Sequence, residues 1–242
     1  MDEKYWLFYL LALVAEIIGT VSGFGSSILF VPLAAMFFDF HEVLGITALF
    51  HVFSNLSKIF LFRKGIDKKI ALKLGIPAVG AVAIGALLSK YVPQKELEVA
   101  MSVLLIILSL YLIKNFDKPL KQTDQNLYGG GLASGFLAGL IGTGGAVRGI
   151  TLAAFNLPKD IFIATSALID LGVDATRAVI YFFNGFMQQK FLWMILPLIV
   201  ISVAGSWIGK QILKKTSEKM FRFVVLGVII ATSGVQLVKY FL

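Results

Sequence analysis

The sequence contains no cysteine among its 242 residues and only two histidines. The absence of cysteine excludes disulfide bonds, thiolate nucleophiles and cysteine-ligated metal sites. His41 and His51 are accompanied only by scattered carboxylates, which is not a metal-ligand pattern. No nucleophile stands beside a base in a catalytic arrangement either. We therefore expect no metal ion, no cofactor and no enzymatic activity.

Charged residues are also scarce, at 15% of the chain, whereas soluble domains carry about 25%. Hydrophobic residues make up 58%, the mean hydropathy is +0.87, and several apolar runs approach the roughly 20 residues that cross a bilayer. Together these values exclude a soluble globular protein. The sequence predicts an all-α, multi-pass integral membrane protein, which we place in the cell (cytoplasmic) membrane.

The net charge of +8 could suggest a nucleic-acid partner. The lysines and arginines lie mainly in short connections between apolar runs, and no aromatic and basic groove pattern accompanies them. That placement is typical of anchoring at a membrane surface. We expect the lipid bilayer as a partner and no nucleic acid, while the oligomeric state, including a homo-oligomer, stays open.

The chain contains an internal duplication. Gly23-Phe24-Gly25 recurs 119 residues later as Gly142-Thr143-Gly144, and each cluster interrupts an apolar run. Further glycines and prolines downstream recur at nearly the same offset, which makes chance similarity improbable. We interpret residues 1–115 as a first membrane repeat, 116–127 as a linker and 128–242 as a second repeat, all within one integrated membrane domain.

Each half is expected to hold one glycine-broken segment followed by three transmembrane helices. A broken segment of about 30 residues would measure about 45 Å as a helix, which exceeds the roughly 30 Å hydrocarbon core. A re-entrant hairpin of two half-helices suits that length, although a broken segment that crosses the membrane fully is the alternative. The basic connections at residues 63–73 and 210–222 occupy non-equivalent places in the repeat. If both are cytoplasmic, the halves are inverted; eight full crossings with parallel repeats is the other possibility.

The glycine breaks are candidate anion sites. Half-helices beginning at Ser26-Ser27 and at Gly145-Ala146 would direct partly positive N-terminal amides into the protein. The alternative is that these small residues only allow close helix packing. The candidate substrate-binding residues of the breaks are Ser22, Gly23, Gly25, Ser26, Ser27, Gly142, Thr143, Gly144 and Gly145.

Polar residues also recur downstream of each break, with spacings that place them on one helical face. Lys58 and Arg177 would attract an anion, although Lys58 could instead reach the lipid headgroups and Arg177 could form a structural ion pair with Asp174. Thr47, Thr165 and Ser166 would supply neutral donors. The two sets are His51, Asn55 and Lys58 in the first half and Asp170, Asp174 and Arg177 in the second.

Charges in otherwise apolar segments add further candidates. Arg148 stands where the first half has Leu29, so it either contacts substrate or pairs with a carboxylate such as Asp170. Glu16 carries a proton or pairs with a lysine. Intramembrane carboxylates commonly serve ion coupling, and the candidates for proton or sodium coupling are Asp170, Asp174, Glu16 and His51.

Three motifs then suggest a family. Gly142-Thr143-Gly144-Gly145, the earlier Gly23-Phe24-Gly25-Ser26-Ser27 with Val31-Pro32, and Ala164-Thr165-Ser166-Ala167 resemble the TauE/SafE family of sulfite and organosulfonate transporters. The resemblance extends over essentially the whole chain. It implies transport of a small sulfur-containing anion such as sulfite or an organosulfonate. The paired breaks and the intramembrane cations add the expectation of a secondary transporter, working as an exporter, that binds this anion near the midplane between the two breaks. A passive anion channel is the alternative.

Overall fold

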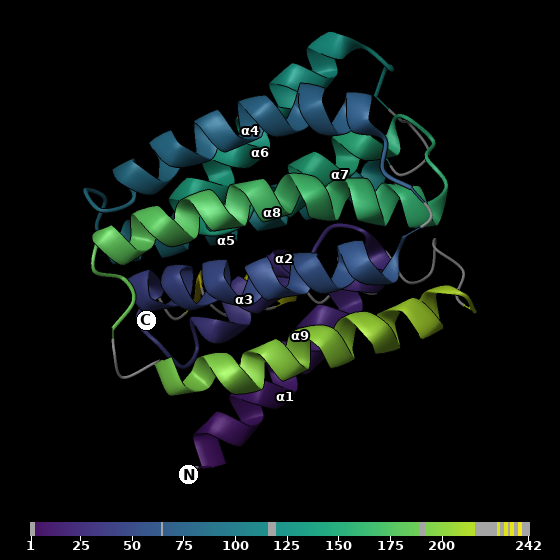
Figure 1. The fold of residues 1–242 in the computed structure, drawn as a ribbon. Coiled ribbons are helices and arrows are strands. Elements are labelled where there is room, and N and C mark those ends of the chain that lie inside the picture. The colour runs from purple at the N-terminus through teal and green to yellow at the C-terminus, as the bar shows by residue number, and fades with distance from the viewer. Residues whose placement is uncertain are drawn as a thin grey trace.

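The computed structural model describes residues 3–63, 65–115, 120–188 and 192–215 and a few residues between 227 and 238, and its regular structure there consists of helices joined by short connections. Figure 1 shows the arrangement of the helices. The all-α prediction is confirmed. The helices are α1 (Glu3–Ser22), α2 (Ser27–Ala34), α3 (Phe40–Leu61), α4 (Lys68–Leu88), α5 (Gln94–Lys114), α6 (Asp124–Ile141), α7 (Gly145–Ala153), α8 (Lys159–Phe183) and α9 (Leu192–Leu213).

Five of these helices, α1, α3, α4, α5 and α9, are long and apolar enough to cross a membrane. Their outer faces carry large apolar side chains that are well exposed, such as Leu196 at 72% and Ile76 at 68%. Exposed apolar area on this scale is unfavourable in water and favourable against lipid tails. The chain is a multi-pass membrane protein.

The glycine-broken segments consist of a long and a short helix rather than two equal halves. In the first segment α1 has 20 residues and α2 has 8, and in the second α6 has 18 and α7 has 9. Helix α6 already begins at Asp124, within the stretch expected to be a linker, because Thr123 accepts a capping hydrogen bond from the amide of Asn126. The last predicted apolar span, residues 220–238, lies largely outside the described residues.

The long helices pack in pairs that bring distant parts of the chain together. Helix α1 packs against α9, α6 against α4, and α3 against α8. Glycines allow the α4–α6 contact to be very close: a Cβ at Gly131, Gly135 or Gly139 would lie between 2.1 and 2.3 Å from a backbone oxygen of α4. The short helices α2 and α7 contact each other between these long helices (Figure 1), and the residues of α2 from Ile28 to Val31 are at most 1% exposed.

Candidate anion site between two helix breaks

Both breaks are made by glycines in the left-handed region of backbone conformation. Helix α1 ends at Ser22, and Gly23 and Gly25 follow with φ of +75° and +83°. Helix α6 ends at Ile141, and Gly142 follows with φ of +80°. A side chain destabilises this conformation by about 1–2 kcal/mol, so glycine is the residue that stops each helix here and lets the chain turn into the short helix.

The two breaks meet inside the protein. Ser27 Oγ, at the start of α2, lies 3.3 Å from Thr143 Oγ1, just before α7. A Cβ placed on Gly145 would lie 1.9 Å from the carbonyl oxygen of Phe24, so the two connections are in direct backbone contact. The first turns of α2 and α7 line one buried polar cavity, together with Arg148 and Asp170. The residue before each short helix, Ser26 or Gly144, provides no side-chain cap.

Glu16 forms the most highly connected polar cluster. Its side chain is completely buried in α1, and its carboxylate forms an ion pair of 2.9 Å with Lys58 Nζ on α3. Oε1 accepts hydrogen bonds from Ser54 at 2.7 Å, from Ser206 of α9 at 2.8 Å and from Thr20 at 3.4 Å. Oε2 accepts a 2.6 Å bond from the Ser26 hydroxyl. The expectation that Glu16 pairs with a lysine is therefore confirmed.

Lys58 does not reach toward lipid headgroups, so that alternative is wrong. The residue is only 5% exposed, and besides Glu16 its ammonium group donates a 2.7 Å hydrogen bond to Ser54 Oγ. The Glu16 carboxylate of α1 and the Ser54 hydroxyl of α3 itself satisfy the ammonium group inside the protein, which removes the reason for the side chain to extend outward.

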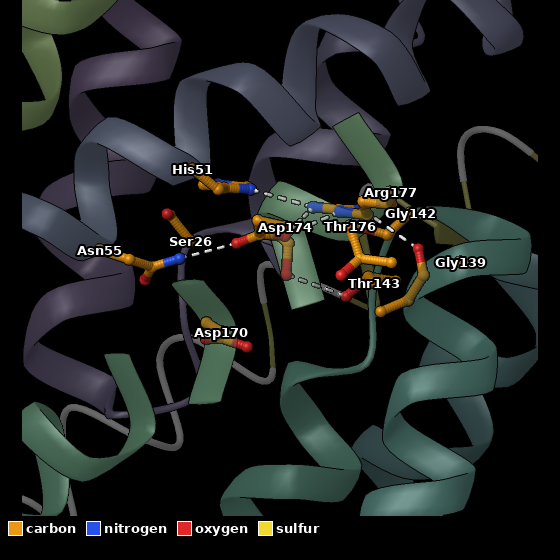
Figure 2. Close-up of polar contacts among 12 residues, drawn as sticks. Ser26, His51, Asn55, Gly139, Gly142, Thr143, Asp170, Asp174, Thr176 and Arg177 are labelled. Carbon is orange, nitrogen blue, oxygen red and sulfur yellow. Dashed lines mark hydrogen bonds and ion pairs between the residues drawn. The ribbon is translucent and has the colours of Figure 1, made fainter. Parts of the chain in front are cut away.

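Arg177 binds backbone carbonyls at the C-terminal end of α6. It forms the predicted pair with Asp174, with Nε to Oδ1 at 2.7 Å, and Nη1 donates to the carbonyls of Gly142 at 2.7 Å and Ala138 at 3.2 Å. Figure 2 shows this fork, together with the 2.7 Å bond from Asn55 Nδ2 to the other oxygen of Asp174. Arg177 thus satisfies carbonyls that the helix itself leaves unpaired.

His51 presents a donor without a partner. Arg177 Nη2 lies 3.4 Å from His51 Nδ1 (Figure 2). Because a guanidinium only donates, His51 Nδ1 must accept, and the ring proton is assigned to Nε2. Within the described part of the chain, His51 Nε2 and the buried hydroxyl of Thr47 have no hydrogen-bond partner. His51 lines the same cavity as the two breaks.

Arg148 and Asp170 form the third ion pair. Arg148 Nη1 contacts Asp170 Oδ1, Nε donates a 2.9 Å bond to Ser166 Oγ, and Nη2 lies 3.5 Å from the carbonyl oxygen of Phe24. The pairing expectation for Arg148 is confirmed. Asp170 is the more accessible partner, with a side chain 15% exposed against 5% for Arg148.

Charge around the breaks is balanced. Each of three buried cations faces a carboxylate, in the pairs Lys58–Glu16, Arg148–Asp170 and Arg177–Asp174. The second-half cations also hold the chain at the breaks, through the carbonyls of Phe24 and Gly142. An anion entering this cavity meets a site with no net charge but with several neutral donors.

Several of the predicted residues, Ser22, Gly23, Thr47 and Thr165 among them, do not line the cavity at the breaks. Thr165 Oγ1 accepts a 3.0 Å bond from the amide of Asp67, in the connection before α4. Ser22 lines a separate pocket that opens near the ends of α7 and α9.

The sequence did not indicate Ser54, Ser206 or the hydroxyl of Tyr181, which donates a 2.6 Å hydrogen bond to the Gly139 carbonyl. Serines spaced along apolar helices gave no signal by themselves, since their partners are on other helices.

Comparison with known proteins agrees with the architecture. Residues 8–236 match the family model described as Sulfite exporter TauE/SafE. The chain belongs to the TauE/SafE family. This TauE/SafE protein is also similar to the Probable membrane transporter protein YunE of Bacillus subtilis (strain 168), with 24% identity over 274 residues that cover 97% of each chain. No solved structure matches. The protein is thus a member of a membrane transporter family, as the motifs in both halves indicated.

Proposed function

We propose that this protein is a secondary transporter, operating as an exporter in the cytoplasmic membrane, for a small sulfur-containing anion such as sulfite or an organosulfonate. The observation that carries the proposal is the meeting of the two breaks. The hydroxyls of Ser27 and Thr143 lie 3.3 Å apart where the two half-helix N-termini meet, and Ser27, Gly144 and the Arg148 side chain line one cavity there. Helix N-termini and hydroxyl donors are suited to oxyanions. The family and the relative are transporters, and a non-enzymatic role fits them.

The roles of the residues follow from their contacts. Ser27, Thr143, the first-turn amides and the Nε2 proton of His51 contact the anion directly. Arg148 shares its guanidinium between the anion and Asp170. Lys58 and Arg177, whose nitrogens face protein acceptors, stabilise the anion through their field and hold the breaks in place.

The balanced charge favours a coupled mechanism over a passive channel. An anion added to a neutral cavity in the membrane leaves an uncompensated charge, which costs at least a few kcal/mol. A proton or sodium ion that binds with it removes this cost. Asp170 is suited to that ion: Oδ1 contacts Arg148, and among the described residues no hydrogen bond reaches its Oδ2, which borders Gly25. Asp174 and Glu16 have both oxygens engaged.

The helix contacts are those expected of two equivalent halves, and we propose that these halves are inverted, with re-entrant broken segments. The packing of α1 on α9 has a counterpart in α6 on α4, and that of α3 on α9 has one in α8 on α4. Asn55 and Asp174, which occupy equivalent places 119 residues apart, bond to each other. Single cysteines at Gln94 and Gln188 should react from outside and one at Lys68 from inside. Ser217, a further inside position, lies outside the described residues. Labelling of Asn126 from outside would contradict the re-entrant arrangement.

The function is tested by sulfite and sulfonate flux into proteoliposomes under imposed pH and sodium gradients. We expect saturable flux that one gradient drives. The informative variant is Arg148→Leu combined with Asp170→Asn, because it introduces the residue of the first half, Leu29, and keeps the site neutral. It should fold and lose flux. Flux that follows voltage alone without saturation would favour the passive channel, and undiminished flux in the variant would contradict a substrate site at Arg148.

A further inference from the structure

A second, larger pocket opens on the surface beside the first break. It has a volume of about 650 Å³ and is lined by Ser22, Gly23, Asn156, Lys159, Phe162 and Leu213. These residues come from the end of α1, the connection between α7 and α8, and the end of α9. The proposed anion site does not include this pocket, so its relation to the buried cavity calls for an explanation.

An inner cavity lies between the surface pocket and the central cavity at the breaks. Gly23 and Ile163 line both the surface pocket and the inner cavity. Lys58 and Asp170 line both the inner cavity and the central cavity at the breaks. Three spaces therefore follow one another, and each shares residues with the next. The cations and hydroxyls along this line, including Ser166 beside Arg148, would favour an anion over an apolar solute.

The ring of Phe162 lines the surface pocket next to Gly23, which lines both that pocket and the inner cavity. Phe162 is 9% exposed, and its Cε1 lies 2.7 Å from the position of a Cβ on Gly23. The ring therefore rests directly on the glycine backbone at the break. It belongs to the first turn of α8, and a rotation of this one side chain would change the opening without moving a helix.

On the other side of the breaks, aromatic side chains form a buried cluster. The ring centroid of Phe30 on α2 lies 5.7 Å from that of Phe8 and 4.8 Å from that of Phe50. The centroids of Phe8 and Phe38 are 5.1 Å apart. Phe8, Phe30 and Phe50 are each 1% exposed. The cluster also contacts His51, whose ring lies 5.9 Å from that of Phe30. Opening this side would require separation of α1, α2 and α3, which is a far larger rearrangement than a ring rotation.

The surface pocket opens on the side of the basic connections. Lys210, near the end of α9, donates to the carbonyl of Leu61 at the end of α3, and Leu213 lines the pocket. The connection that leads into α4 contacts the start of α8 through Asp67 and Thr165. Both lysine-rich connections thus begin beside the pocket, which makes this the cytoplasmic side if the positive charges remain inside.

We propose that the substrate route runs from this basic, cytoplasmic face past Phe162 to the two breaks. The structure then represents the conformation in which the binding site is accessible from the cytoplasmic face and closed toward the opposite face. The inference rests on the proposed transport function and adds the access route and its constricting residue to it. Phe162 is a positioning and access residue, and the anion passes beneath its ring without a covalent step.

Cysteine accessibility tests the route without a substrate, because the chain has no cysteine of its own. Three alanines provide matched positions: Ala153 in the surface pocket, Ala167 in the inner cavity and Ala12 in the buried aromatic side. Each Ala→Cys variant is treated with a membrane-impermeant anionic methanethiosulfonate from either side of oriented vesicles. Ala153→Cys should react rapidly from the cytoplasmic side, Ala167→Cys more slowly from the same side, and Ala12→Cys from neither.

Adding Phe162→Ala should raise the rate at Ala167→Cys by roughly tenfold, equivalent to about 1.4 kcal/mol of barrier, and leave Ala153→Cys unchanged. Phe162→Leu keeps more bulk and should give a smaller increase. The unchanged rate at Ala153→Cys also reports that the variant is folded. Faster labelling of Ala167→Cys from the opposite face, or no response to Phe162→Ala in the folded protein, would overturn the route. Absence of sulfite flux with this labelling pattern intact would instead contradict the proposed substrate.

Discussion

Replacement of Glu16 by glutamine should destabilise the protein more than any other isosteric change at the breaks. The substitution keeps the shape of the side chain and an oxygen that accepts from Ser54 and Ser206. The new amide nitrogen would face the Ser26 hydroxyl, which can turn to accept. The hydrogen bonds of the cluster therefore survive in large part, and the main loss is the negative charge beside Lys58.

The magnitude follows from burial. Lys58 is 5% exposed and lies 2.9 Å from the Glu16 carboxylate. Removing one member of a buried pair costs about 3–5 kcal/mol, because the other charge is left uncompensated. We expect about 3 kcal/mol, the lower end, since Lys58 retains its bond to Ser54. For a chain of this length that corresponds to roughly 6–12 °C in melting temperature.

The reverse substitution, Lys58→Met, should cost less. The Glu16 carboxylate would keep hydrogen bonds from four hydroxyl groups, on Thr20, Ser26, Ser54 and Ser206. Hydrogen bonds to a charged group contribute about 1.5–3 kcal/mol each, and they partly compensate the isolated carboxylate. Removing both charges together should therefore cost less than the sum of the single changes.

Thermal unfolding in detergent, followed by the fluorescence of the three tryptophans, measures all four proteins. Glu96→Gln, at an exposed carboxylate at the start of α5, serves as the control and should melt like the wild type. The interpretation is refuted if Glu16→Gln melts like this control, or if the double variant is destabilised by the full sum of the two single changes.

Three further predictions concern the breaks. Gly23→Ala should destabilise the protein by about 1–2 kcal/mol because of its φ of +75°, and by about 1–3 kcal/mol more because the new Cβ would overpack against Phe162. Gly185→Ala, at a φ of +80° with nothing within 4 Å, should show only the first effect. Equal melting temperatures of the two variants would contradict this. Arg177→Lys should lower the melting temperature and the transport rate, because a single ammonium cannot reach both Asp174 and the carbonyls at the end of α6; wild-type thermal stability would show that the fork is dispensable. Asp170→Asn should leave a folded protein whose flux no longer responds to the coupling gradient, and a retained gradient dependence in proteoliposomes would exclude Asp170 as the coupling site.

The sequence alone was sufficient to predict the helical membrane architecture and the convergence of the two glycine clusters. Long apolar runs and a repeated glycine pattern report local properties of the backbone, and these survive in the structure as α1, α2, α6 and α7. The Asp174–Arg177 pair was also predictable, because residues three apart on a helix are neighbours.

The remainder depended on contacts between helices. No local pattern indicates that Ser206 of α9 reaches Glu16 of α1, 190 residues away, or that Phe162 rests on Gly23. The role of Arg177 changed for the same reason: its acceptors on α6 are more than thirty residues distant. Helical spacing correctly placed the cations on the helix faces that point into the protein, but it could not indicate which acceptors on other helices bind them.

The central claim, that an anion binds between the two breaks, is tested most directly by saturable sulfite flux in proteoliposomes with Ser27→Ala and Thr143→Ala combined. The two hydroxyls lie 3.3 Å apart at the meeting point, and each bond to an anion contributes about 1.5–3 kcal/mol. The account predicts that the double variant folds and that its apparent KM rises by at least about tenfold, the effect of about 1.4 kcal/mol. An unchanged KM in a folded double variant would contradict it.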